Sequence, residues 1–343
     1  MLKLYPDFYH KFRCLASACP DNCCVGWEVV VDDDTARFYD TVPGDLGRQL
    51  RSAMTTDEDG DRIIRMTEGH CPFWTENHLC RVELELGHDA PCATCRKFPR
   101  LTQDYGVFTE YGLTLACPEA ARLILTHHGP WQAETEGTLG DPGETDLDWA
   151  FLRELAEARE ALLKELWQEE VPERQALARC LLHGRQFQQR FDGFDPEPLP
   201  PELPPEGDPR PLLHAHLELE ILTEDWRLLL EEALAYTGPL PSLPETGMAR
   251  NLAADYLYRY WFRAVNDWDC VLRLQLLAVN WAVARHLARV HLALHGSLSQ
   301  NTLLRLFQLY AKEVEHDDVN RESLEELLLT QEIFSLEALL SLI

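Results

Sequence analysis

Apolar residues recur at helical spacing through most of the second half of the chain. An amphipathic helix is predicted over residues 149–169, because its apolar side chains fall near one face. Those side chains are Phe151, Leu155, Leu162 and Leu166. The pattern predicts further helices at about 172–191, 212–236, 249–265, 269–295, 298–315 and 321–341. Residues 149–343 are therefore predicted to form an all-α domain.

The first half of the chain alternates short apolar runs with polar and cysteine-bearing loops. β-Branched runs predict short strands at about 26–31, 62–66 and 106–114. Short helices are predicted at about 35–41, 46–54, 81–86 and 118–127. Residues 131–148, rich in Gly, Pro, Thr and acidic residues, are predicted to be a linker. The predicted fold is mainly α, with an irregular Cys-rich module at 1–130 and a helical domain at 149–343.

Composition limits the partners of the chain. It has 343 residues, of which 45% are hydrophobic and 26% charged, as in an ordinary globular protein. A formal charge of -27 excludes non-specific binding to nucleic acid or to an anionic membrane, since both require a basic surface. The longest uncharged run of the helical part, 274–284, is too short to span a bilayer, and no signal peptide is recognisable. We therefore expect a cytoplasmic protein, whose thiols stay reduced.

Nine of the eleven cysteines lie between residues 14 and 117, and they are the main chemical signal of the sequence. They are Cys14, Cys19, Cys23, Cys24, Cys71, Cys80, Cys92, Cys95 and Cys117. Short polar and Pro-containing spacers separate them, so several thiolates can converge on a metal centre. Nine thiols exceed one four-thiolate site. They could serve two such sites, or one site plus structural or reactive thiols. The remaining two, Cys180 and Cys270, stand among leucine and valine residues and are predicted to be core residues.

The spacing of the cysteines departs from common metal motifs. Only Cys92 and Cys95 have the two-residue separation of a zinc ribbon, and the regular ferredoxin series is absent. The close cysteine triplet of ordinary radical S-adenosylmethionine enzymes is absent too. A fold stabilised by structural zinc, without a redox role, is therefore an alternative to an iron–sulfur protein. No Gly-rich strand–turn–helix segment of a Rossmann-like methyltransferase is recognisable.

A series of short motifs between residues 12 and 120 is similar to the flagellin lysine-N-methylases, a group with a cysteine-rich domain thought to chelate zinc or iron. The motifs are Phe12-Arg13-Cys14, Cys23-Cys24-Val25-Gly26-Trp27, Asp32, Cys71-Pro72-Phe73, Leu79-Cys80, Cys92, Thr94-Cys95-Arg96-Lys97-Phe98-Pro99-Arg100 and Ala116-Cys117-Pro118-Glu119-Ala120. The resemblance implies methylation of flagellin lysines with S-adenosylmethionine as donor and a [4Fe-4S] cluster. It marks the nine cysteines as candidate ligands without saying which four bind a cluster.

Methyl transfer to lysine requires a neutral amine, because an ammonium has no lone pair. Glu110 and Tyr111, shortly before Cys117, are the candidate catalytic residues that would accept the proton. Trp27, Arg96 and Arg100 are candidates for binding the donor, the two arginines through its carboxylate. The alternative for each is ordinary: aromatic side chains pack in cores and charged ones face solvent.

Two further function classes stay open at this point. One is a metal-binding protein without catalytic activity, which docks a partner through its helical half. The other is a redox protein that uses a cluster for electron transfer alone. His214 and His216 are predicted to be surface residues, and the aromatic run at 256–262 is predicted to pack between helices.

Overall fold

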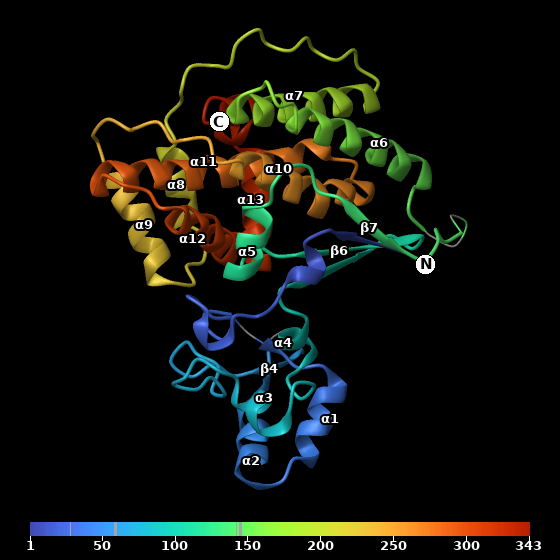
Figure 1. Ribbon diagram of the computed structural model, residues 1–343, viewed down its shortest axis with the longest axis vertical. Helices are drawn as coiled ribbons and strands as arrows, with labels where there is room; N and C mark the ends of the chain where they lie inside the picture. Colours follow the sequence, from blue (N-terminus) through green and yellow to red (C-terminus); the bar gives the residue numbers. More distant parts are fainter. Residues whose placement is uncertain (28, 58–59, 142, 144–145) are drawn as a thin grey trace. The chain divides into compact units, whose positions relative to one another are not determined.

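The computed structural model describes residues 1–343 except 28, 58–59, 142 and 144–145, which include parts of the predicted strand at 26–31 and of the predicted linker. The chain divides into two compact units that are interleaved in sequence (Figure 1). One, here called the helical unit, contains residues 1–12, 102–116 and 120–343. The other, here called the thiol unit, contains residues 13–101 and 117–119.

The helical unit is built around one long central helix. α11 (Cys270–His295) begins at the N-cap Asp269, whose side chain accepts a hydrogen bond from the amide of Leu272, and ends at Gly296 in the left-handed conformation. Its side chains are buried nearly all round, as expected for a helix enclosed by others. Its neighbours are α7 (Glu173–Phe191), α8 (Arg210–Leu217), α9 (Glu224–Ala235), α10 (Met248–Arg259), α12 (Gln300–Tyr310), α13 (Asp318–Thr330) and α14 (Leu336–Leu340).

Helix α6 (Trp149–Leu166) packs against α7 and α10. All regular structure described beyond residue 149 is helical, which confirms the predicted all-α character. Helices α6, α7 and α11 lie within a few residues of their predicted bounds. Cys180 and Cys270 are fully buried, as predicted.

Two predicted helices are wrong, because each is divided into two shorter helices. The helix predicted at 212–236 is two helices, α8 and α9. Between them, the amide of Leu222 donates to the buried carboxylate of Glu313, and the amide of Glu220 donates to Asn320. The helix predicted at 321–341 likewise divides into α13 and α14, and Ser335 caps the second of these.

A four-stranded sheet belongs mainly to the helical unit. Its order is β5 (Arg100–Asp104), β6 (Phe108–Leu113), β1 (Leu2–Pro6) and β7 (Ala133–Glu136). β1 pairs in parallel with β6, Leu4 opposite Glu110, and antiparallel with β7, Lys3 opposite Glu136. The hydroxyl of Tyr258 on α10 donates to the carbonyl of Leu4 (3.1 Å), which ties the sheet to the helices. Residues 131–148, predicted as a linker, thus contain a strand.

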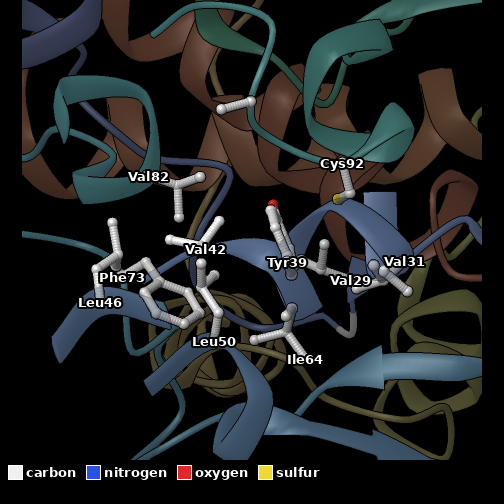
Figure 2. Packing of buried hydrophobic residues seen from close by; sticks show 12 residues of the cluster. Val29, Val31, Tyr39, Val42, Leu46, Leu50, Ile64, Phe73, Val82 and Cys92 are labelled. Atoms are coloured by element: carbon white, nitrogen blue, oxygen red, sulfur yellow. The ribbon is translucent and has the colours of Figure 1, made fainter. Parts of the chain in front are cut away.

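The thiol unit is small and has its own apolar core (Figure 2). It contains a sheet of β2 (Val29–Val30), β4 (Arg62–Ile64) and β3 (Met54–Thr56), with α1 (Asp33–Thr41), α2 (Gly44–Ala53), α3 (Arg81–Leu86) and α4 (Ala93–Lys97). Tyr39 of α1, Val42 just after it, and Leu46 and Leu50 of α2 belong to one core with Val29 and Ile64 of the sheet. Cys92 belongs to this core, and Cys71 and Cys80 pack against it.

Candidate functional site

The thiols of the thiol unit gather in one neighbourhood. A hydrogen bond with Cys23 and burial raise the pKa of the Cys24 thiol, and the nearby thiols of Cys71 and Cys80 raise it further. Burial, opposed in part by a backbone hydrogen bond, raises the pKa of Cys71 to about 11, and Cys80 and Cys92 contribute to the rise. The thiol of Cys95 is in turn close to Cys24 and Cys23. The fold therefore brings together six cysteines from three separate parts of the sequence.

Cys92 and Cys95 form a close pair. Their sulfur atoms are 3.5 Å apart and are joined by a hydrogen bond. This hydrogen bond lowers the pKa of Cys92 to about 7 against the opposing effect of burial, and raises the pKa of Cys95. Backbone amides at the start of α4 also favour the thiolate of Cys92, as at other helix N-termini.

Local hydrogen bonds fix this pair in place. The carboxylate of Asp32 accepts from the amide of Thr35, which caps α1 (3.0 Å), and from the amide of Ala93 at the start of α4 (2.8 Å). Burial opposes ionisation of Asp32, but these hydrogen bonds outweigh it and lower its pKa to about 2. Thr94 donates to the carbonyl of Val30 (2.8 Å). Asp32 therefore joins the start of α1 to the Cys92–Cys95 turn, a role that an N-cap pattern alone does not reveal.

The other cysteines lie in short turns or next to the ends of short helices. The amide of Cys71 donates to the carbonyl of Cys24 (2.8 Å), which joins the first cysteine group to the second. Cys80 is the N-cap residue of α3, and burial raises its pKa although amides of that helix oppose the rise. Burial raises the pKa of the Cys19 thiol, and the nearby thiols of Cys14 and Cys23 raise it further. Cys117 is half-buried and belongs to the same unit, immediately before α5 (Pro118–Leu125).

Tyr39 is a site residue that the sequence analysis missed. Burial raises the pKa of its hydroxyl, and the thiols of Cys92, Cys95, Cys80 and Cys71 raise it further. Its hydroxyl is therefore within electrostatic reach of four of the thiols, while its ring packs in the core beside Val42 and Val29 (Figure 2). Ala36, Tyr39 and Val42 follow helical spacing, so periodicity predicts that the ring is buried but not what its hydroxyl faces.

The chemical type of these side chains, the thiol, is suited to binding a metal centre. Thiolates are the preferred ligands of zinc and of iron–sulfur clusters, and all eleven cysteines are free of disulfides. In the described part of the chain, however, no three Cys, His, Asp or Glu side chains are grouped so that they could hold a metal ion. Metal binding, and the choice between zinc and a cluster, therefore stay predictions.

Three residues predicted to bind the donor also belong to the thiol unit. Trp27 lies beside the cysteines: its indole nitrogen donates to the carbonyl of Cys23 (3.2 Å), and its ring is near Phe98. Arg96 donates to the carbonyls of Asp89 and Pro91 (2.8 and 2.6 Å) and so holds the loop before Cys92. Arg100 is exposed at the start of β5. Their predicted role in donor binding stays a prediction.

Glu110 and Tyr111, the predicted catalytic residues, lie on β6 of the helical unit. Glu110 is buried, and its two carboxylate oxygens accept hydrogen bonds from Arg159 (3.1 and 2.6 Å). The guanidinium of Arg159 also lies 3.7 Å from the ring centre of Phe262. Tyr111 stacks on Tyr5, with ring centres 4.6 Å apart. Both side chains therefore have structural contacts, and their catalytic role stays a prediction.

The aromatic run at 256–262 surrounds a second buried polar group. The carboxylate of Glu315 accepts hydrogen bonds from Tyr256 (2.7 Å), Arg259 (2.9 Å) and Asn280 (2.7 Å). Glu315 ends a π-helical turn (Ala311–Glu315), a form common at functional sites. The rings pack between helices, as predicted. His216, by contrast, is fully buried and bonded to the carbonyl of Leu212, so the prediction of a surface residue was wrong.

Within the described residues, no helix is both long enough and apolar enough to cross a membrane. No solved structure matches the chain. Residues 241–342 match the family model described as the FliB lysine N-methylase C-terminal domain.

Curated relatives carry related names. The chain is 34% identical to a lysine-N-methylase of Salmonella typhimurium over 126 residues, 35% of this chain and 31% of that protein. It is 33% identical to the flagellar biosynthetic protein FliU of Salmonella muenchen over 132 residues, 35% of this chain and 75% of that protein. The match thus spans about a third of the first relative and three quarters of the second. The chain belongs to the FliB-type lysine-N-methylase family.

Proposed function

We propose that the chain is a protein-lysine N-methyltransferase that uses S-adenosylmethionine and acts on flagellin. Membership of the lysine-N-methylase family is the observation that carries this proposal. The name of the FliU relative, a flagellar biosynthetic protein, favours a flagellar substrate. A chain with a formal charge of -27 suits a protein substrate better than a nucleic acid.

The gathered thiols are the proposed ligands of a [4Fe-4S] cluster, which when bound supplies a one-electron redox centre. Cys92, whose pKa is lowered, and Cys95 are proposed as two of the ligands. Asp32 and Arg96 would hold their turn in place, and Tyr39 would offer its hydroxyl to the sulfur atoms. Zinc is the second candidate for the same thiols, because the Cys92–Cys95 spacing is that of structural zinc sites.

The acceptor lysine must lose its proton before it can attack the methyl group. We propose Glu110 and Tyr111 as the residues that receive it, as the sequence predicts. Glu110 can do so only when one of its oxygens is released by Arg159, since both are occupied. This requirement makes the role of Glu110 testable separately from that of the thiols.

Anaerobic purification followed by iron, sulfide and zinc analysis tests the centre. Iron and sulfide in equal amounts support a cluster, and stoichiometric zinc supports the alternative. The double variant Cys92→Ala/Cys95→Ala should lose the metal, whereas Cys180→Ala, which removes a buried thiol of the helical unit, should retain it. A double variant with full metal content contradicts the proposed ligands.

Incubation of the loaded protein with methyl-labelled S-adenosylmethionine and flagellin tests the activity. Methyllysine in flagellin, found by mass spectrometry, is the expected product. A metal-loaded protein that binds flagellin but transfers no methyl group would favour a binding protein without catalytic activity.

A further inference from the structure

Two arginines on one face of α11 converge on a single carboxylate. Arg285 and Arg289 are one helical turn apart, and both bond Oε1 of Glu206, Arg285 at 3.1 Å. Arg289 also donates to the carbonyls of Pro241 (2.8 Å) and Leu240 (3.1 Å). These contacts fix the guanidinium of Arg289, so that it presents a preformed site for a carboxylate.

The arginines line a cavity of about 390 Å³ within the helical unit. His286 lines the same cavity and is 7% exposed. Its ring is hydrogen-bonded to the backbone of Ala233, but its Nε2 is buried without a hydrogen-bond partner. Burial, with the charges of Arg289 and Arg285, lowers the pKa of His286 to about 4. The ring is therefore neutral at physiological pH, and its Nε2 is a free acceptor.

Glu206 comes from a segment without regular secondary structure. Residues 193–209, here called the connector, contain no helix or strand and loop outward between α7 and α8 (Figure 1). Prolines remove many of its amide donors, and the amide of Gly207 bonds the carbonyl of Ser341 (3.0 Å). The side chain of Glu206 is 47% exposed, so its ion pairs are weaker than buried ones.

We propose that this cavity binds the α-aminocarboxylate end of S-adenosylmethionine, and that Glu206 occupies the carboxylate position when the donor is absent. Arg285 and Arg289 bind the ligand carboxylate in place of Glu206. Nε2 of His286, which is buried while Glu206 is in place, becomes accessible when Glu206 leaves and accepts a hydrogen bond from the ligand ammonium. The three residues match a zwitterion: two cations for its anion, and a neutral acceptor for its cation. This inference rests on the proposed function, because that function names the donor, and it assigns the donor carboxylate to Arg285 and Arg289 in place of Arg96 and Arg100.

Calorimetric binding of two related ligands tests the inference without methyl transfer. S-Adenosylhomocysteine carries the aminocarboxylate, whereas 5′-methylthioadenosine keeps the adenosine and sulfur but lacks it. The test variant is Glu206→Gln. The matched control is Glu197→Gln, which neutralises a carboxylate of the same connector that pairs instead with Arg185 (3.3 Å).

Glu206→Gln removes the internal competitor. If that competitor holds the site nine times in ten, the variant should bind S-adenosylhomocysteine about tenfold more tightly. Glu197→Gln should bind it like the wild type, and 5′-methylthioadenosine should not distinguish the variants. Arg289→Gln should weaken S-adenosylhomocysteine about tenfold or more, the value of one well-placed charged contact. Because Glu206 is on an exposed connector, its variant carries the test even if Arg289→Gln folds poorly.

Equal affinity of wild type and Glu206→Gln for S-adenosylhomocysteine would overturn the inference, as would an equal gain with 5′-methylthioadenosine. Methylation of flagellin by a protein with either result would leave the proposed function intact and place the donor elsewhere. The predicted binding pattern without any methyl transfer would uphold the pocket and refute the proposed function.

Discussion

The Glu110–Arg159 pair offers a direct test of whether a predicted catalytic residue is in fact structural. The side chain of Glu110 is 1% exposed and that of Arg159 13%. Both carboxylate oxygens face the guanidinium, and Phe262 covers its other side. Glu110→Gln keeps the shape of the side chain but leaves Arg159 as a buried cation without a counter-ion.

Breaking a buried ion pair by removing one partner costs about 3–5 kcal/mol. The contact of Arg159 with Phe262 remains in the variant, so we expect the lower part of this range. For a unit of this size, a loss of about 3–4 kcal/mol lowers the melting temperature by roughly 6–16 °C. Differential scanning calorimetry should detect it. Glu160→Gln, an exposed neighbour of Arg159 on α6, should change the melting temperature little.

A double-mutant cycle separates the pair from each residue alone. Arg159→Met removes the cation, so Glu110→Gln/Arg159→Met should be more stable than the sum of the single losses predicts. A variant Glu110→Gln that melts with the wild type would refute the stability argument for the ion pair. Loss of methyl transfer in that variant at unchanged stability would support the proposed proton transfer by Glu110.

Two other predictions follow from single side chains. Asp32→Ala removes hydrogen bonds at the starts of both α1 and α4. It should lower the free energy of unfolding, measured in urea, by about 2–3 kcal/mol and should reduce the metal content. The control Asp33→Ala, at an exposed neighbouring residue, should change neither quantity. Burial lowers the pKa of His216 from 6.5 to about 4. As the pH falls, the imidazole is therefore protonated in the unfolded chain before it is protonated in the folded protein. The free energy of unfolding should fall by roughly 3 kcal/mol between pH 6.5 and pH 4. His216→Gln should flatten this part of the pH–stability curve, whereas the exposed His214→Gln should leave it unchanged; equal slopes in all three proteins would contradict the assignment.

The long helices could be predicted because their signals are local. α11 has an acidic N-cap, a Gly C-cap and continuous apolar periodicity between them, and its observed bounds differ from the prediction by one residue. The helix predicted at 212–236 failed for the opposite reason. Its interruption depends on Glu313 and Asn320, about 90 to 100 residues further along the chain. No pattern within the segment encodes those hydrogen bonds.

The strands of the larger sheet also depend on contacts between distant parts of the sequence. β7 is exposed along its whole length, and so it lacks the alternation that marks a strand. It is a strand because its backbone pairs with β1, more than 120 residues earlier. β1 in turn pairs with β6, which makes the first twelve residues part of the helical unit.

The sequence alone determined the nine cysteines, their order and their flanking residues, which predict a metal centre, together with the family that they indicate. It could do so because residue type and spacing are properties of the chain. Only the tertiary structure decided which thiols share a neighbourhood, that Glu110 is paired with Arg159, and that Arg285, His286 and Arg289 line a cavity with Glu206. Those facts depend on contacts between distant segments, whose geometry is set by packing of the whole unit rather than by any local pattern.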